Sequence, residues 1–340
     1  MNKIRLSICI PIYNFGAFIG ATLDSIITQA TNDVEIVIVD GASTDNTTEV
    51  IQRYQKTFPH LNYHRLEKRG GIDRDMAKTV ELASGEYCWL FGGDDIMMPG
   101  TLTRMLEKIS LGSDLFLCET ILCDFNLHPI EKHNLFNIMA EKSFHLGNKA
   151  ERSQYFESAL NTAAFFSFCG SLIFKRSVWE SVKINESFIG SCWAHVARFF
   201  EIIPHGLTVT YLPEPYLYKR GGNDSFGDRG IVRRLHLAID GYSKLANAFF
   251  GKESMEAFHI RRVLRNEFSM LWFVYLKSEC HKKKILGDIL ILDNLVNILY
   301  YDPLLTNRIY LFLYRFTPLS VYRVSSSIWR RIRALFVKMS

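Results

Sequence analysis

Two adjacent aspartates, Asp94 and Asp95, follow directly after an apolar run and two glycines, Gly92 and Gly93. Adjacent carboxylates repel each other and gain nothing from packing, so a divalent cation held on them would explain the pair. Hard cations such as Mg²⁺ and Mn²⁺ take oxygen ligands and usually share them with a substrate phosphate. The alternative is a turn whose carboxylates cap the helix that follows.

A third carboxylate, Asp40, ends the apolar run at residues 36–39 and precedes Gly41 and several hydroxyl side chains. At the tip of a strand, Asp40 could accept hydrogen bonds from a ribose or a base, and the glycine would permit close backbone approach. The simpler interpretation is a strand–loop–helix connection with a capped helix.

Tyr13 follows the first apolar run, two residues after Pro11. Its ring could pack on a nucleobase, or it could be a half-buried core residue. No P-loop and no GxGxxG fingerprint follows either of the first two runs. Chemistry that cleaves ATP or transfers hydride therefore lacks its usual support.

These residues are placed by elements that alternate in type over the first third of the chain. Strands are expected at 6–12, 34–39, 61–66, 86–91 and 115–124, and helices at 18–29, 44–56, 73–82 and 101–109. The alternation predicts an α/β fold with a parallel sheet and ligand sites at the carboxyl ends of its strands. Residues 126–220 are less regular, with helices expected at 149–160 and 192–203 and strands at 170–174 and 207–212.

From about residue 229 onward the pattern predicts helices only. They are expected at 231–250, 255–279, 283–300, 304–315 and 321–337. The chain of 340 residues, 48% hydrophobic, allows one large domain or two of ordinary size. No uncharged apolar run is long enough to span a bilayer.

The cysteines and the distribution of charge indicate which metal sites and binding partners can be expected. The seven cysteines lie among apolar neighbours without a CxxC pair, which indicates reduced buried thiols and makes a zinc site improbable. Residues 261–340 carry 14 lysines and arginines against 5 acidic residues, whereas the first 260 carry 26 against 30. A basic excess confined to one end favours an anionic surface as partner and argues against a nucleic-acid binder.

Together, the segments 7–14, 35–45 and 92–95, with Pro99 and Gly100, resemble family 2 glycosyltransferases of the GT-A fold. The resemblance implies a Rossmann-like mixed sheet with helices on both faces over residues 1–225 as catalytic domain. A helical, basic C-terminal region over 226–340 would follow. It also implies an inverting, metal-dependent transfer from a nucleotide-sugar donor, with Mg²⁺ or Mn²⁺ as cofactor.

The same resemblance assigns roles to individual residues. Pro11, Tyr13 and Asp40 would hold the nucleoside, and Asp73 would lie near the base or ribose. Arg74 would lie near phosphate, unless it is a solvated helix residue. Asp94 would contact ribose and metal, and Asp95 is placed with the catalytic residues. Gly93, in the glycine pair, would leave space for a ribose or form a strained turn.

Two departures from the family pattern bear on catalysis. Gly92 stands where the acidic motif usually begins with aspartate, and Ser191 and Cys192 stand where a Glu-Asp pair usually supplies the base. An inverting transferase needs a base to take the acceptor's hydroxyl proton. His195, one helical turn further on, could serve as that base near neutral pH. It could instead contact the acceptor or pack a helix.

A second glycine-rich loop spans residues 219–227. In it, Arg220, Asn223 and Ser225 could close over the donor diphosphate, unless the segment is an ordinary flexible connection. Further on, the expected helix at 321–337 has one apolar face and basic surroundings, which is typical of helices lying in an anionic membrane interface. The alternative is a helix packed on the catalytic domain.

The segments 69–75 and 220–225 are most similar to the branch that contains O-antigen abequosyltransferases. That branch implies a CDP-activated dideoxyhexose donor and a lipid-linked oligosaccharide acceptor, and UDP-sugar donors stay open. The expected location is cytoplasmic, at the inner face of the cell membrane. Two alternatives are a nucleotide-sugar-binding subunit without catalysis and a membrane-associated scaffold of a polysaccharide assembly complex.

Overall fold

The computed structural model describes residues 3–223 and 230–316. Their internal contacts divide them into two compact units. We call the first, up to Ser158 and then Ala163–Arg220, the sheet unit. The second, Ala159–Thr162 and the described residues from Gly221 onward, is the helical unit. Each unit is described by itself.

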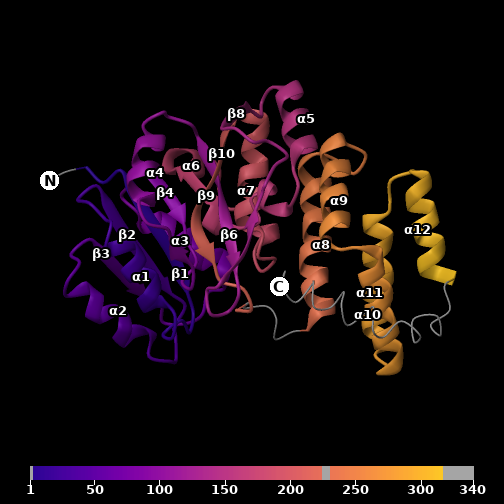
Figure 1. Ribbon diagram of the computed structural model, residues 1–340, viewed down its shortest axis with the longest axis horizontal. Helices are drawn as coiled ribbons and strands as arrows, with labels where there is room; N and C mark the ends of the chain where they lie inside the picture. Colours follow the sequence, from indigo (N-terminus) through magenta and orange to yellow (C-terminus); the bar gives the residue numbers. More distant parts are fainter. Residues whose placement is uncertain (1–2, 224–229, 317–340) are drawn as a thin grey trace. The chain divides into compact units, whose positions relative to one another are not determined.

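One mixed sheet of ten strands organises the described part of the sheet unit. Its order is β3, β2, β1, β4, β9, β6, β10, β5, with β7 beside β6 and β8 beside β10 (Figure 1). The strands are β1 Leu6–Ile12, β2 Val34–Asp40, β3 Leu61–Arg65, β4 Tyr87–Leu90, β5 Ile96–Met97, β6 Leu115–Cys123, β7 Pro129–His133, β8 Lys142–His145, β9 Leu172–Lys175 and β10 Thr208–Lys219. Strands β3, β2, β1 and β4 are parallel, whereas β9 pairs antiparallel with both β4 and β6. The parallel strands expected from the alternation are therefore found at β3, β2, β1 and β4, and the sheet as a whole is mixed, as the family resemblance implies.

Helices cover both faces of this sheet. Strand β1 is buried along its whole length, so its side chains pack in two directions. Ile8 and Ile10 face the cluster that includes α1 (Ile19–Ile27), α2 (Thr47–Gln55) and α4 (Thr101–Ile109). Cys9 points to the other face, where its Sγ lies 3.8 Å from the Thr79 carbonyl oxygen of α3 (Ile72–Leu82).

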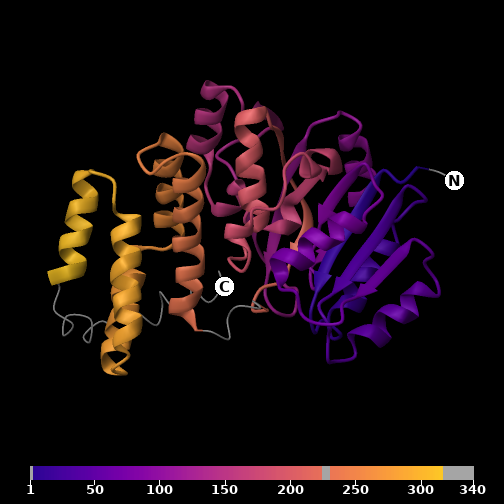
Figure 2. The same cartoon turned by 180° about the vertical axis from the view of Figure 1, so that it is seen from behind.

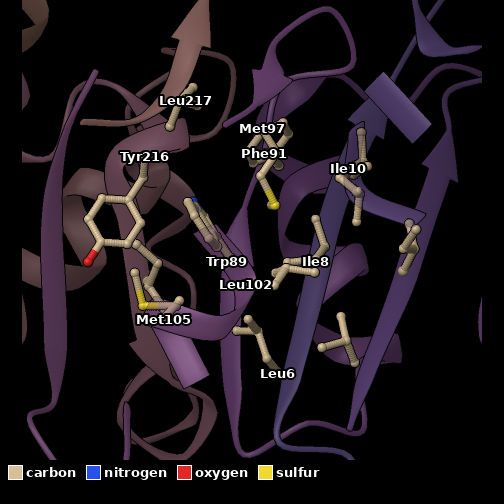
Figure 3. Close-up of a cluster of buried hydrophobic side chains, with 14 of the residues drawn as sticks. Leu6, Ile8, Ile10, Trp89, Phe91, Met97, Leu102, Met105, Tyr216 and Leu217 are labelled. Carbon is tan, nitrogen blue, oxygen red and sulfur yellow. The ribbon is translucent and has the colours of Figure 1, made fainter. Parts of the chain in front are cut away.

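The core beneath α4 is aromatic and thioether-rich. Figure 3 shows Trp89 between Met105 and the end of β10, with Ile8 and Phe91 beside it. The Trp89 indole N–H donates to the Gly170 carbonyl oxygen at 2.8 Å, so its polar atom is satisfied although the ring is fully buried. This packing fixes β4, and therefore the start of the turn that carries the two adjacent aspartates.

The remaining helices of the sheet unit are α5 (Lys149–Ser158), α6 (Arg176–Glu180) and α7 (Ala194–Ile202). The helical unit contains α8 (Ile231–Phe249), α9 (Met255–Glu267), α10 (Met270–Lys282), α11 (Leu286–Leu299) and α12 (Leu305–Phe316), drawn from orange to yellow in Figure 2. The single helix expected at 255–279 is wrong, because the chain breaks at Phe268 and Ser269 before α10 begins. The helix expected at 321–337 lies outside the described residues. Within the described ranges, no helix combines the length and the apolar character needed to cross a membrane.

Candidate active site

The loops after β1 and β2 are tied to each other at the carboxyl edge of the sheet. The Asn14 amide donates to the Ser43 hydroxyl at 2.8 Å, and the Asn14 side-chain oxygen accepts from the Thr44 amide at 2.8 Å. Asn14 and Ala42 both adopt left-handed backbone, with φ of 59° and 65°. Non-glycine residues in that region are strained and are typical of ligand-binding sites.

Asp40 supports this edge from beneath. It is fully buried, and its Oδ1 accepts from the Ser43 amide at 2.7 Å while its Oδ2 accepts from the Tyr63 hydroxyl at 2.6 Å. Burial and the Asp40 hydrogen bond raise the pKa of Tyr63 to about 12. Asp40 thus braces the loop after β2, and the contact with a ribose or base expected for it stays a prediction.

Tyr13 and Pro11 lie where the sequence predicts a nucleoside. Pro11 is buried within β1 opposite Val39, whereas Tyr13 is half-buried beyond the strand end. The Arg69 guanidinium lies 4.1 Å from the centre of the Tyr13 ring, in a cation–π contact. Sequence reasoning assigned no role to Arg69, because the contact joins residues 56 positions apart.

Asp73 is bonded to the loop that precedes α7. It is 6% exposed, and its carboxylate accepts from the backbone amides of Gly190 at 2.8 Å, Cys192 at 3.0 Å and Ala194 at 3.1 Å. Cys192 has left-handed backbone with φ of 69°, so this carboxylate holds a strained loop at the start of α7. The structure shows this supporting role, and the expected contact with base or ribose stays a prediction.

Arg74, the next residue, is half-exposed and pairs with Glu186 at 2.8 Å. Exposed pairs of this kind contribute little to stability. This placement fits the alternative of a solvated helix arginine, and the expected phosphate contact stays a prediction.

The two glycines before the aspartates are packed. A Cβ at Gly93 would lie 2.6 Å from Ile12 Cγ2 and 2.9 Å from Phe15 Cδ1. Ile12 and Phe15 therefore occupy the space where a side chain at Gly93 would begin, and the ribose contact expected there stays a prediction. A Cβ at Gly92 would lie 2.6 Å from Asp95 Oδ2, so this glycine lets the Asp95 carboxylate fold back over the chain.

The buried side chain of Asp95 connects the aspartate turn to the backbone at Arg220. It is 3% exposed, and its Oδ1 accepts from the Arg220 backbone amide at 3.0 Å. Burial, together with the charge of Asp94, raises the pKa of Asp95 to about 7. Asp95 thereby joins the aspartate turn to the end of β10, and the catalytic role expected for it stays a prediction.

Asp94 is half-buried in the same turn and is the carboxylate suited to a cation. Mg²⁺ and Mn²⁺ sites in nucleotide enzymes use one or two carboxylates and complete their shell with phosphates and waters. A donor set of one carboxylate fits that pattern. Among the described residues, no group of three or more His, Cys, Asp or Glu side chains is arranged to hold a metal. A cation here would therefore be shared with the substrate.

The Arg220 side chain makes its contacts with other residues of the protein. Its Nε donates to the Asp94 carbonyl oxygen at 3.1 Å, its Nη1 donates to the Phe125 carbonyl oxygen at 2.5 Å, and its guanidinium lies 5.1 Å from the Phe18 ring centre. Arg220 thus ties two loops together, and its expected closure over a diphosphate stays a prediction. Asn223 belongs to the helical unit and Ser225 lies outside the described residues, so their roles stay predictions.

His195 lies on α7 and is 5% exposed. Its Nε2 lies 3.0 Å from the Phe166 carbonyl oxygen, which requires that nitrogen to carry the proton. Its buried Nδ1 therefore holds a lone pair and has no hydrogen-bond partner among the described residues. Burial lowers the pKa of His195 to about 4, and the nearby charge of Asp73 opposes the shift. The imidazole is neutral at physiological pH.

The sequence pattern that defines Glycosyl transferase family 2 matches residues 7–181. Over 253 residues the chain is 33% identical to abequosyltransferase RfbV of Salmonella typhimurium, a match that covers 73% of this chain and 76% of that protein. Over 189 residues it is 25% identical to GalNAc(5)-diNAcBac-PP-undecaprenol beta-1,3-glucosyltransferase of Campylobacter jejuni, covering 55% and 57% of the two.

A solved structure agrees at the level of the fold. S. aureus TarS 1–349 in complex with UDP-GlcNAc matches with a TM-score of 0.64 at 16% identity, over 96% of this chain and 92% of that one. The mixed α/β sheet with C-terminal helices that the sequence predicts is confirmed as the GT-A fold.

Proposed function

The chain belongs to glycosyl transferase family 2, and on that premise we propose that it transfers a sugar, with inversion, from a nucleotide-diphosphate donor to a lipid-linked saccharide acceptor. The product would be a bacterial surface polysaccharide, an O-antigen or a capsule. The observation that carries this proposal is the Asp94–Asp95 turn at the carboxyl edge of the sheet. Gly93 packs on Ile12 and Phe15, so this turn lies beside the β1 loop that bears Tyr13.

The donor would bind along this edge. The ring of Tyr13 would stack on the base of the nucleoside. Asn14 and Ala42 adopt left-handed backbone, and we propose that the ligand lies against these two loops. The relative TarS was solved with UDP-GlcNAc, a donor of the proposed class. Beyond the base, Asp94 would contact the ribose and a cation.

A divalent cation would be held by Asp94 together with the donor. When bound, Mg²⁺ or Mn²⁺ neutralises the charge that develops on the departing diphosphate. The protein itself holds the Asp94 backbone in place. Arg220 does this through the Asp94 carbonyl oxygen and Asp95 does it through the Arg220 amide.

His195 is the residue we propose as base. Its Nε2–H is committed to Phe166, which leaves the unpartnered Nδ1 lone pair to take the acceptor's proton. The lowered pKa keeps the imidazole unprotonated throughout the physiological range, at a cost in basicity. Asp73 lies close enough for its charge to stabilise the imidazolium that would form.

Two observations support the proposed lipid-linked acceptor: the name of one relative and the charge of the C-terminal region. The name of the Campylobacter jejuni relative specifies a PP-undecaprenol-linked substrate, which supports a lipid-linked acceptor here. The basic excess of residues 261–340 would attract an anionic membrane surface. We therefore propose residues 1–225 as catalytic domain and 226–340 as the membrane-associating region, at the inner face of the membrane.

The test is nucleotide binding followed by transfer. Thermal unfolding is measured with CDP-, UDP-, GDP- and dTDP-sugars, with and without Mn²⁺, for wild type, Asp94→Asn and the control Asp33→Asn. A ligand that binds the native state raises its stability. We expect one nucleotide series to stabilise wild type and the control with Mn²⁺, and Asp94→Asn to lose the metal dependence. Absence of any nucleotide effect on wild type would overturn the proposed function.

A further inference from the structure

Two buried arginines of the helical unit share a single carboxylate. Arg261 donates to Asp302 Oδ1 from Nε at 3.0 Å and from Nη2 at 2.5 Å, and Arg265 donates to Asp302 Oδ2 from Nη1 at 2.9 Å. The side chains are 7% exposed for Arg261, 12% for Arg265 and 6% for Asp302. Among the described residues, no second carboxylate lies within ion-pair distance of either arginine. One positive charge of this buried group is therefore uncompensated, which is costly in a protein interior.

A cavity of about 240 Å³ opens beside Arg261. Helices α8, α9 and α11 pack on one another around it (Figure 1). These helices and the loops that follow α8 and α11 supply the lining side chains, which are Ser243, Lys252, Arg261, Asn297, Ile298 and Tyr301. This lining contains two cations and no carboxylate. Pockets for drug-sized ligands measure roughly 300–1,000 Å³, so the cavity suits a smaller group.

The polar side chains of the lining offer hydrogen-bond donors. Lys252 Nζ lies 3.7 Å from the centre of the Tyr301 ring and has no carboxylate partner among the described residues. Arg261 directs three of its five N–H groups to oxygens of the protein, so two are left. The Asn297 side-chain oxygen accepts from Arg315 at 3.0 Å, which leaves the Asn297 amide N–H groups to donate.

The acidic residues next to the lining residues in the sequence are already bonded. Glu253, which follows Lys252, accepts from the Tyr301 hydroxyl, and both oxygens of Asp302 accept from the two arginines. Glu253 is exposed, so solvent and salt screen its charge. The balance of charge at the cavity is therefore positive, and an anion would be attracted to it.

We propose that this cavity binds a phosphate group. A phosphate presents at least three acceptor oxygens in a tetrahedral arrangement, which suits donors that converge from separate segments, whereas a carboxylate presents two. Arginine and lysine are the side chains that proteins use most to bind phosphate. The group could belong to a soluble phosphate compound or to the head group of an anionic phospholipid, since both offer the same chemistry. The proposal concerns the helical unit alone and does not depend on the proposed transfer reaction.

The experiment uses the full chain and probes both sources of phosphate. Calorimetry measures the binding of inorganic phosphate, pyrophosphate and acetate, and co-sedimentation measures the binding of phosphatidylcholine vesicles with and without phosphatidic acid. Lys252→Gln removes a charge from the lining, and Asn297→Asp places a carboxylate in it. Both residues are exposed, so the fold should persist, and thermal unfolding checks this. The matched control is Lys283→Gln, which removes an exposed lysine at the end of α10 that does not line the cavity.

We expect wild type and Lys283→Gln to bind phosphate alike. Lys252→Gln and Asn297→Asp should bind it about tenfold or more weakly, as for the loss of a hydrogen bond to a charged group. Saturable binding of inorganic phosphate or pyrophosphate would identify a soluble source. Binding found only with vesicles that contain phosphatidic acid, and weakened in the same two variants, would identify a lipid head group.

Three results would overturn the proposal. Equal weakening in Lys252→Gln and Lys283→Gln would show a general attraction between charges and no site. Acetate that binds wild type as tightly as phosphate would show that the cavity does not select phosphate. Wild type that binds neither the soluble phosphates nor the vesicles with phosphatidic acid would show that the charge shared by Arg261 and Arg265 is a structural feature only.

Discussion

The Asp73 carboxylate accepts the backbone amide of Cys192 at 3.0 Å and so joins the first turn of α3 to a loop 119 residues further on. The same carboxylate bonds the amides on either side, at Gly190 and Ala194. Ala194 begins α7, so Asp73 acts as the N-terminal cap of a helix that is remote from it in sequence. The position of His195 therefore depends on a residue of α3.

Replacing Asp73 should loosen this loop. Asp73→Ala removes the acceptor of three buried amides, and we expect a loss of about 2–4 kcal/mol in the free energy of unfolding, measured in urea. Arg74→Ala, which breaks only an exposed pair, is the control and should change stability by less than about 0.5 kcal/mol. Equal effects of the two substitutions would contradict the capping role.

Gly93 should not tolerate a methyl group. Gly93→Ala forces a Cβ against Ile12 and Phe15, and overpacking of this kind costs about 1–3 kcal/mol. Gly287 in α11 offers the matched control, because a Cβ there meets nothing within 4 Å. Gly287→Ala should stabilise by about 0.5–1 kcal/mol through helix propensity. Denaturant unfolding of both variants measures the contrast, and a Gly93→Ala protein as stable as wild type would refute the packing argument.

The role of His195 can be separated from its packing. His195→Gln keeps an N–H that can donate to Phe166 but cannot take a proton, so it should preserve the fold. We expect turnover to fall by about 10²–10⁴, as for loss of a general base, with donor affinity near that of wild type. Turnover close to wild type in a folded variant would remove His195 from the catalytic role and favour helix packing.

Asp75 should make stability depend on pH in a defined window. Its pKa is about 6 in the folded chain against an ordinary value of 3.8, so between these values the folded state binds the extra proton. Wild type should therefore lose stability relative to Asp75→Asn as pH rises from about 4 to about 6. Above that window the difference should stay constant, on the order of 2 kcal/mol. Urea unfolding at pH 4, 5, 6 and 7.5 measures it, and a pH-independent difference would show that Asp75 titrates normally.

The elements with continuous apolar runs could be predicted from the sequence. Strands β1 and β2 are buried along their whole length, and their bounds lie within one residue of those expected. Strand β7 was missed because it is mostly exposed and includes Glu131 and Lys132, so no apolar run marks it. The break before α10 was missed because Ser269 was read as a helical residue, although serine is a common first residue before a helix.

At the site, the sequence could predict which residue types gather at the sheet edge, but it could not predict their hydrogen-bond partners. It identified the edge formed by Tyr13, Asp40 and the adjacent aspartates, because strand ends gather polar residues there. It could not show which oxygens the protein itself satisfies. Asp40 and Asp73, which are expected to meet the ligand, also bond to the chain, whereas Asp75, for which no role is expected, has a buried oxygen without a partner among the described residues. That difference depends on distances between loops, which spacing along a chain does not contain.

The glycine at position 92 has a consequence for how this sequence can change. Family 2 glycosyltransferases usually carry aspartate there, but a side chain at that position would enter the volume now held by Asp95 Oδ2, 2.6 Å from the new Cβ. Asp95 could yield only by disturbing its bond to the Arg220 amide, which anchors the end of β10. A side chain at position 92 would therefore require the Asp95 carboxylate to move from the place it now occupies. The glycine and the present position of Asp95 thus depend on each other.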